Sequence, residues 1–245
     1  MENLDIDKFL DNDYDTIAKP DYSSLSLEER ASRGDADAQN ELGTAYMQGY
    51  GVQLDYKKGL HWFIEAAAQG HTGAFANLGI CFLTGLGIPK NYKNAFKLLK
   101  KSAERGYALA QYNLGVMYEN ALGVEEDYEM ALYWYALAAK QNYAMAINNI
   151  GNCFMYGKGE QKNYQAAFSY YMQAAKQNLP IAQYNVGVCY FNGFGVNKDI
   201  ALAEKYLRLA ADGGNRDAIV ALQTIFKKLR FNTYKTYPTF GYVFC

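Results

Sequence analysis

The side chains that could do chemistry in this chain are its two histidines, its four cysteines and a series of Gly-x-Gly phrases. His61 and His71 have no Cys, Ser or carboxylate at a spacing typical of a catalytic motif. No C-x-x-C pair accompanies them, so a zinc site is not predicted. The Gly-x-Gly phrases lack the third glycine and the preceding strand of a nucleotide-binding loop. We therefore expect no catalytic residue, no metal site and no cofactor.

Three of the cysteines hold one position of an internal repeat. Cys81, Cys153 and Cys189 are separated by multiples of 36 residues, and Met117 takes the same position between the first two. A position that accepts both Cys and Met is typical of a buried apolar site, because a reduced cysteine behaves as a small apolar residue. We interpret these cysteines as structural thiols in a protein of a reducing compartment.

A phrase of 36 residues recurs without insertion or deletion along most of the chain. Its five copies start at Ala38, Ala74, Ala110, Ala146 and Ala182. In each copy the fifth residue is aliphatic and the sixth is glycine, as in Leu114-Gly115. A fixed period of this length predicts a solenoid, in which each unit buries its apolar face against its neighbours.

Each copy divides into two helices, which we name helix A and helix B. In the third copy the apolar residues of helix A recur at helical spacing, at Ala110, Leu114, Met117, Tyr118 and Ala121. The glycine beside this row would let helix B approach closely. A Gly-x-Gly-Val phrase then ends helix A, since glycine readily takes the left-handed conformation that closes a helix. An Asp or Asn that can cap helix B follows at Asp55, Asn91, Asp127, Asn163 and Asp199.

The phrase A-x-x-x-L-G-x-x-Y-x-x-G-x-G-V, followed by D/N-Y-x-x-A-x-x-W-F/Y-x-x-A-A, resembles the Sel-1-like repeat (SLR) family, a relative of the tetratricopeptide repeats. The resemblance extends from Leu25 to about Leu229. It implies an all-α fold, a right-handed α-solenoid (superhelix) of antiparallel helix pairs, with a role in protein–protein contacts. The chain departs from the pattern at Ala121 and Glu160, which replace loop residues, and at Gln223, which replaces the glycine of the doublet.

We divide the chain into three parts. Residues 1–24 form an acidic N-terminal segment that we expect to be flexible, with a short helix around Leu4–Leu10. The solenoid, residues 25–230, consists of a half repeat at 25–37, full repeats at 38–73, 74–109, 110–145, 146–181 and 182–217, and a terminal helix at 218–230. Residues 231–245 form an aromatic C-terminal tail, which we expect to lie extended over the terminal helix. The alternatives are a disordered tail and a tail that docks in a partner.

The face of helix A opposite its apolar row is poor in charge. In related helical repeats this face lines a concave groove, so we predict that it binds a partner. The predicted partner-binding residues are Asn77, Ile80, Leu83, Tyr112, Asn113, Val116, Glu119, Asn148, Asn149, Asn152, Met155, Tyr184, Asn185, Val188 and Phe191. Tyr112, Tyr184 and Phe191 are the expected anchors, because large aromatic residues carry much of the energy of an interface. The alternative is that these side chains pack between adjacent repeats.

One Asn per repeat, at Asn77, Asn113, Asn149 and Asn185, accompanies this face. An amide both donates and accepts hydrogen bonds, so these side chains could pair with the backbone of an extended peptide. The alternative is that each one bonds a neighbouring loop or turn.

Composition limits the kind of partner. The net charge is −1, so we predict no basic surface for nucleic acid. No apolar run approaches the ~20 residues that span a bilayer, and the N-terminus has no secretion signal. We expect a cytoplasmic, non-catalytic scaffold or adaptor with a protein or peptide partner. The alternatives are an immunity or inhibitor protein that sequesters a cognate toxin or enzyme, and an enzyme or an accessory subunit that completes an enzyme site. The oligomeric state stays open.

Overall fold

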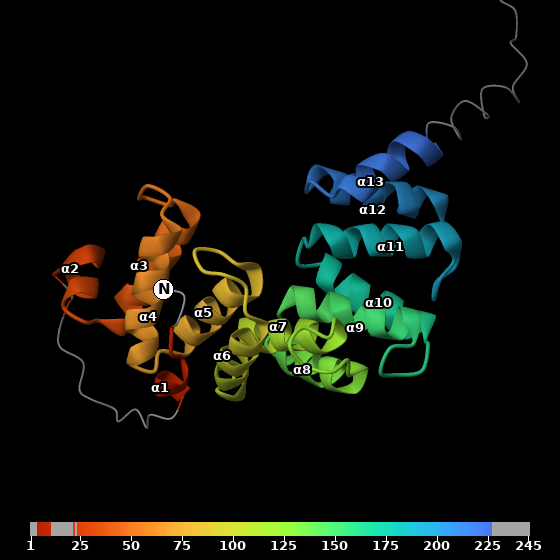
Figure 1. Ribbon diagram of the computed structural model, residues 1–245. Coiled ribbons are helices and arrows are strands. Elements are labelled where there is room, and N and C mark those ends of the chain that lie inside the picture. The colour runs from red at the N-terminus through yellow and green to blue at the C-terminus, as the bar shows by residue number, and fades with distance from the viewer. Residues whose placement is uncertain (1–3, 11–21, 23, 227–245) are drawn as a thin grey trace, which may run out of the picture. The chain divides into compact units, whose positions relative to one another are not determined.

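The computed structural model describes residues 4–10, 22 and 24–226, and these residues form thirteen α-helices and one π-helical turn without any strand (Figure 1). They belong to two units, the first ending at Tyr143 and the second beginning at Ala144. Unit 1 contains α1 (Asp7–Leu10), α2 (Leu27–Ser32), α3 (Ala36–Gln48), α4 (Tyr56–Ala68), α5 (Thr72–Thr84), α6 (Tyr92–Glu104), α7 (Ala108–Glu119) and α8 (Tyr128–Lys140). Unit 2 contains α9 (Ala144–Tyr156), α10 (Tyr164–Ala175), α11 (Pro180–Asn192), α12 (Ile200–Asp212), α13 (Arg216–Ala221) and the π-helical turn Leu222–Phe226.

Consecutive helices pack in pairs, and each pair is one copy of the repeat. Helix A packs on helix B as α3 on α4, α5 on α6 and α7 on α8 in unit 1, and as α9 on α10 and α11 on α12 in unit 2. Each pair also packs on the next pair within its unit. The predicted all-α solenoid of helix pairs is therefore confirmed. The half repeat predicted before the first pair contains α2, a single helix B that begins with a capping box formed by Ser26 and Glu29.

Every helix B begins at the predicted cap. The Oδ1 atom of Asp55 accepts hydrogen bonds from the backbone amides of Lys57 and Lys58, both at 3.0 Å. The caps of the other four helices each accept one such bond, at 2.9 to 3.0 Å: Asn91, Asp127, Asn163 and Asp199. These bonds satisfy amides that the first turn of a helix leaves without a partner, which fixes where each helix B starts.

The end of helix A differs in the third repeat. Gly85 and Gly193 close α5 and α11 in the left-handed region, with φ of 81° and 79°. Ala121 replaces that glycine after α7 and takes a φ of 54°, which is unfavourable for a residue with a Cβ atom. The prediction that Ala121 belongs to the apolar row of helix A is wrong, because α7 already ends at Glu119 and Ala121 is exposed.

The doublet glycine permits the predicted close contact between the two helices of a pair. A Cβ atom on Gly115 would lie 2.6 Å from the ring of Tyr135 in α8. The same atom on Gly151 would lie 2.6 Å from the ring of Tyr171 in α10. These distances are far below van der Waals contact, so only glycine fits here. The large ring of helix B fills the space beside helix A, and both Tyr135 and Tyr171 are buried.

The apolar core runs along these contacts. Leu114 and Met117 are fully buried, and Trp134 is 8% exposed within the same cluster of unit 1. Cys81, Cys153 and Cys189 are buried as predicted. Burial raises the pKa of the Cys81 and Cys189 thiols to about 12, so these two stay protonated at neutral pH.

The structure describes part of the N-terminal segment but not the C-terminal tail. Residues 4–10 are packed against unit 1, with Ile6 and Phe9 each 3% exposed, so the expected flexibility of residues 1–24 does not extend to this segment. The short helix expected there is α1. At the other end, Ala218 of the terminal helix is buried. Residues 227–245 lie outside the described residues, and with them the last part of that helix and the predicted tail.

Candidate functional site

The predicted binding residues lie on the helices A, which neighbour one another within each unit. In unit 1 the side-chain amide of Asn77 on α5 donates to Asn40 on α3 at 2.9 Å. In unit 2 the amide of Asn185 on α11 donates to Asn148 on α9, also at 2.9 Å. We call the residues Asn77, Ile80, Leu83, Tyr112, Asn113, Val116 and Glu119 the unit 1 face, and Asn148, Asn149, Asn152, Met155, Tyr184, Asn185, Val188 and Phe191 the unit 2 face.

Most side chains of both faces pack partly against their own unit and are partly exposed to solvent. Asn148 and Met155 are buried, with 2% and 7% exposure, so neither is available to a partner as the structure stands. Every other residue of the two faces is half-buried. Ile80, Leu83 and Phe191 pack partly against the apolar clusters of their own units. The faces are thus part of the fold and also reach solvent.

Two of the four repeated asparagines bond an asparagine of the preceding helix A rather than a loop or turn. Asn77 and Asn185 each bond an Asn that lies 37 residues earlier in the chain. For Asn113 that earlier position is Ala76, which offers no polar side chain, and its amide instead donates to the Leu109 carbonyl at 2.8 Å. Part of the hydrogen-bonding capacity predicted for a peptide is therefore used between neighbouring helices. An amide has two N–H donors and an oxygen that can accept twice, so one bond does not exhaust it.

A cluster of tyrosines dominates the unit 1 face. The ring centroid of Tyr112 lies 5.9 Å from that of Tyr135 and 5.3 Å from that of Tyr143. The Tyr135 hydroxyl donates to Oε2 of Glu119 at 2.7 Å. Burial raises the pKa of the Tyr112 hydroxyl, and the nearby Tyr143 and Glu119 raise it further. The ring of Tyr112 therefore contacts two other tyrosines of its own unit.

The unit 2 face has a different arrangement. The Tyr171 hydroxyl donates to Oδ1 of Asn152 at 2.8 Å, where unit 1 has a charged acceptor. Burial raises the pKa of the Tyr184 hydroxyl, as do the charges of Asp217 on α13 and Tyr156 on α9. Tyr156 is 66% exposed.

Tyr156 was not among the predicted binding residues. It ends α9, at a position where the other repeats have a smaller polar residue: Gln48, Thr84, Asn120 and Asn192. A single aromatic in a column of polar residues is the signal that could have identified it. Its exposure and its place near Tyr184 add it to the unit 2 face as a candidate binding residue.

The sequence model of the Sel1 repeat family matches residues 36–71, 76–107, 108–143, 144–179 and 180–215. The chain belongs to the Sel1 repeat family. A comparison with curated proteins gave no match.

Several solved structures share the fold of this chain. A Sel1 repeat protein from Oxalobacter formigenes is 27% identical with a TM-score of 0.73, over 86% of this chain and 89% of that chain. A protective antigen present in uropathogenic Escherichia coli strains, which displays the SLR fold, is 34% identical with a TM-score of 0.70, and the match covers 80% of this chain but only 42% of the antigen. An immunity protein from Pseudomonas aeruginosa is 24% identical with a TM-score of 0.57, over 83% of this chain and 72% of its own, which shows the likeness of fold alone.

His71 has a structural role in the Sel1 repeat. Its Nδ1 atom accepts the backbone N–H of Ala74 at 3.0 Å and so caps α5. An accepting Nδ1 carries no proton, so in the neutral ring the proton is on Nε2, which lies 3.1 Å from Oδ1 of Asp37 and donates to it. This His–Asp pair connects the first turns of two helices A. Within the described ranges, no group of three or more His, Cys, Asp or Glu side chains could hold a metal ion.

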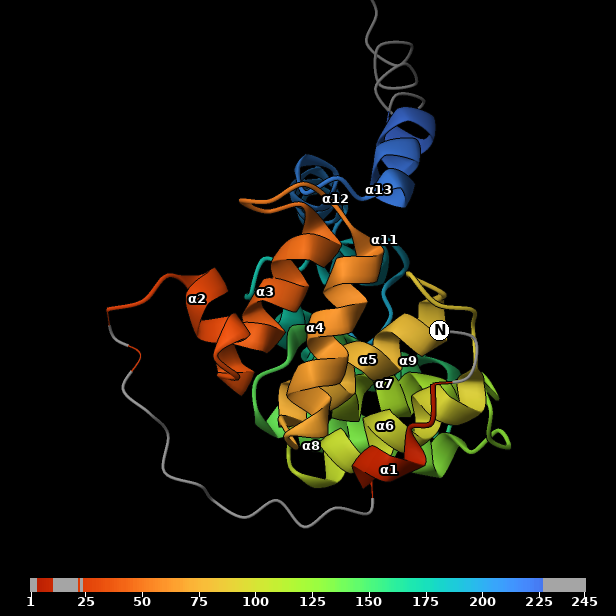
Figure 2. The ribbon, with the colours of Figure 1, turned by 60° about the vertical axis from the view of Figure 1, so that its left-hand side comes forward.

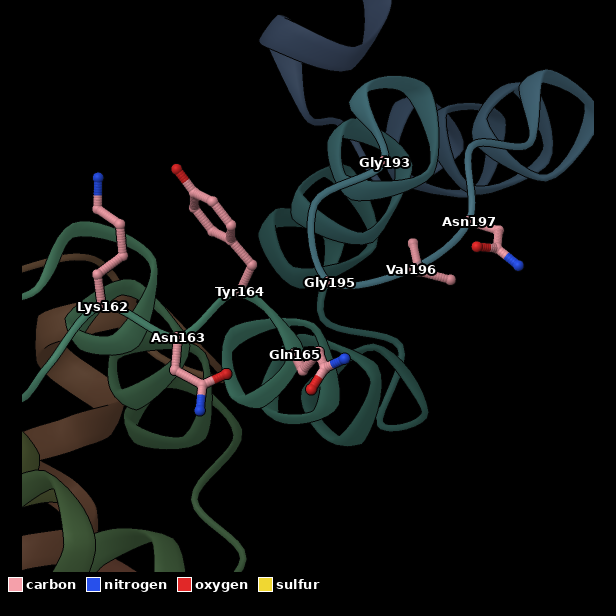
Figure 3. A pocket seen from close by; sticks show the side chains of 8 residues that line it. All are labelled: Lys162, Asn163, Tyr164, Gln165, Gly193, Gly195, Val196 and Asn197. Carbon is pink, nitrogen blue, oxygen red and sulfur yellow. The ribbon is translucent and has the colours of Figure 1, made fainter.

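One open pocket lies away from both faces, between the N-terminus of α10 and the loop that joins α11 to α12 (Figure 3). Its volume is ≈ 610 Å³, and it is lined by Lys162, Asn163, Tyr164, Gln165, Gly193, Gly195, Val196 and Asn197. Tyr164 stacks on Phe194 with ring centroids 4.9 Å apart. The lining contains neither a carboxylate nor a histidine, so it offers no acid–base pair. We interpret it as the gap between stacked loops of neighbouring Sel1 repeats.

Proposed function

We propose that this Sel1 repeat protein is a non-catalytic protein–protein interaction scaffold or adaptor, which binds a peptide segment or a protruding element of a folded partner on its helix A faces. Sel1 repeat proteins generally serve as protein-interaction scaffolds. No helix among the described residues has both the length and the apolar character needed to cross a membrane. The general role of the family supports a protein as the partner.

The composition and exposure of the unit 2 face carry this proposal. Its residues include no Lys, Arg, Asp or Glu, whereas an ordinary solvated helix face is rich in them. Tyr156 is 66% exposed, and Tyr184 and Phe191 are half-buried. Aromatic residues with an accessible polar group are typical energetic anchors, because they bury a large area and lose little side-chain entropy. The Asn side chains beside them supply hydrogen bonds to a partner's backbone.

Capture of partners from the native host, followed by mass spectrometry, tests this proposal. The bait is the wild-type chain, and the comparison is a Tyr156→Ala/Tyr184→Ala double variant. Tyr133→Ala is the matched control, because Tyr133 is a tyrosine on α8 that is 53% exposed and belongs to neither face. We expect the double variant to lose the specific partner and the control to retain it. Retention of the partner by a folded double variant would contradict binding at the unit 2 face.

An immunity or inhibitor role is the second candidate function. The likeness of fold to an immunity protein from Pseudomonas aeruginosa over most of both chains favours it. The same capture experiment separates the two roles. A single toxin or enzyme at equimolar amount supports an immunity protein, and several unrelated proteins support an adaptor. Substrate turnover by the isolated chain would instead show an enzyme.

A further inference from the structure

The chain's own N-terminal residues occupy a surface on the helix B side of unit 1. Ile6 and Phe9 are buried against the core cluster, and both views show α1 beside α6 (Figure 1, Figure 2). The Oδ1 atom of Asp7 lies 2.6 Å from Nζ of Lys97, and Nζ of Lys101 donates to the Leu10 carbonyl at 2.6 Å. A turn with two apolar residues on one side thus lies on α6 between two lysines.

The surface below α1 is the face of α6 that is turned away from helix A. Leu99 points at Gly79 of α5, where an added Cβ atom would lie 2.8 Å from Leu99 Cγ. Lys97 and Lys101 are each two residues from Leu99, which is about 200° around an α-helix. They therefore lie on the opposite side from α5. This surface of α6 is distinct from both helix A faces.

Charge complementarity explains why this segment and this helix meet. The basic residues in and beside α6 are Lys90, Lys93, Lys97, Lys100, Lys101 and Arg105, and α6 has more lysines than any other helix B. The first fifteen residues of the chain contain a single basic residue, Lys8, and the acidic residues Glu2, Asp5, Asp7, Asp11, Asp13 and Asp15. Opposite charges bring the two together, and Ile6 and Phe9 then supply the apolar anchors.

The contact is small for a binding interface. Stable interfaces bury about 800 Å² on each partner, which takes roughly 20 residues or more a side. Residues 4–10 are too few for that, but covalent attachment raises their local concentration to roughly the millimolar range. A ligand of the same chemistry on another protein can replace them if it makes additional contacts along α6.

We propose that the outer face of α6 is a second peptide-binding site, whose ligand is a short amphipathic helix of a partner protein, and that residues 4–10 occupy this site as a tethered competitor. The ligand presents two apolar side chains three residues apart, as Ile6 and Phe9 are, with an acidic residue at the Asp7 position. Lys97 recognises the acidic residue, and Lys101 bonds a carbonyl at the end of the helical turn.

Binding of a fluorescent peptide to the full-length chain tests the proposal. The probe carries residues 1–13, and an Ile6→Ser/Phe9→Ser variant of the protein empties the site. We expect this variant to bind the probe at least about tenfold more tightly than the wild type, because the tethered competitor is gone. A longer designed amphipathic helix with the same Ile, Asp and Phe spacing should bind the wild-type protein by displacing residues 4–10.

Charge variants show whether the probe binds at α6. In the emptied protein, Lys97→Glu should weaken probe binding about fivefold, as expected for reversal of an exposed ion pair. Lys205→Glu is the matched control, because Lys205 is exposed at the same repeat position on α12 and should change nothing. A probe with Asp7→Lys should regain binding to the Lys97→Glu protein. Circular dichroism establishes that each variant is folded.

Three outcomes would overturn the proposal. The first is that the emptied protein binds the probe no better than the wild type does. The second is that Lys97→Glu and Lys205→Glu have equal effects, which would place the probe elsewhere. A wild-type dimer that is abolished by Ile6→Ser/Phe9→Ser would show that a second copy of the chain is the occupant instead of a partner's helix.

Discussion

Tyr112 in unit 1 and Tyr184 in unit 2 hold the same position of the Sel1 repeat, two repeats apart, but their surroundings differ. Tyr112 lies between the rings of Tyr135 and Tyr143. Tyr184 packs partly against the cluster around Leu207 and lies near the exposed Tyr156. A ring that already contacts two others in its own unit buries less additional surface when a partner binds. The comparison fits the proposal that Tyr184 and Tyr156 in unit 2 bind a partner, and it predicts that Tyr112 contributes more to the stability of unit 1.

The helix B residue beneath each tyrosine explains the difference. The ring of Tyr135 in α8 lies against the doublet glycine, Gly115, and near the ring of Tyr112. Its hydroxyl donates to Glu119. The equivalent residue below Tyr184 is Leu207, which has no ring to stack and no hydroxyl to donate. A single change of residue type on helix B therefore alters the contacts that the tyrosine of helix A makes within its own unit. This makes the contrast testable by substitutions at equivalent positions.

The largest change in the free energy of unfolding should come from a substitution in the core of unit 1. Leu114 is fully buried, and Leu114→Ala should lower the free energy of unfolding by about 2–5 kcal/mol, through lost transfer energy and the cavity left behind. Because repeats contact only their neighbours, amide exchange should quicken around α7 and α8 and change little in α11 and α12. Equal loss of protection in all repeats would contradict the prediction that the damage stays local to the neighbours of α7 and α8.

Substitution of the two tyrosines separates stability from binding. Tyr184→Ala should weaken partner binding by about 2 kcal/mol or more and lower the free energy of unfolding by less than Tyr112→Ala does, because Tyr184 packs only partly against the core of its unit. The measurement is titration calorimetry with the captured partner, alongside urea denaturation of the free protein. Unaltered affinity in a folded Tyr184→Ala protein would remove Tyr184 from the site.

Tyr112→Ala should give the opposite result. Removing a half-buried ring that contacts Tyr135 and Tyr143 should cost about 2 kcal/mol of unfolding free energy. Partner affinity should change much less than in Tyr184→Ala. If Tyr112→Ala instead abolishes binding and keeps full stability, the division of roles between the two units is wrong.

Removing the hydroxyl of the helix B tyrosine in each unit should give smaller changes in the free energy of unfolding. Tyr135→Phe deletes a bond to the Glu119 carboxylate and should cost about 1.5 kcal/mol, since hydrogen bonds to charged groups are the stronger ones. Tyr171→Phe deletes a bond to the neutral amide of Asn152 and should cost about 1 kcal/mol. Urea denaturation of both variants measures the difference. A larger loss in Tyr171→Phe would contradict the role assigned to Glu119.

The features that could be predicted from sequence are those set by neighbours within one repeat. Asp55 caps the helix that begins at the next residue, and the doublet Gly115 determines how closely α8 packs. Both depend on local chemistry that recurs every 36 residues, so the period itself reveals them. The free and buried Cys189 followed from the same logic, because Met holds its position elsewhere.

The features that could not be predicted depend on contacts outside the repeat. The ion pair between Asp7 and Lys97 joins residues 90 apart, and the first of them belongs to no repeat. The asparagine bonds depend on what the preceding repeat has at one position, which is why Asn113 departs from the pattern of Asn77. Tyr156 is an exception, because the equivalent residues of the other repeats are polar and exposed, so the period could have indicated an exposed aromatic residue at this position.

The smallest predicted effect concerns the loop that ends α7. Ala121 holds a φ of 54°, whereas Gly85 closes α5 at 81° without a Cβ atom. Left-handed backbone costs a residue with a Cβ atom about 1–2 kcal/mol, but glycine loses more entropy on folding. Ala121→Gly should therefore raise the free energy of unfolding by about 0.5–1 kcal/mol, measured by urea denaturation. Ala136→Gly, inside α8, is the control and should lower the unfolding free energy by about 1 kcal/mol. A destabilised Ala121→Gly protein would show that the alanine side chain makes contacts worth more than the strain it causes.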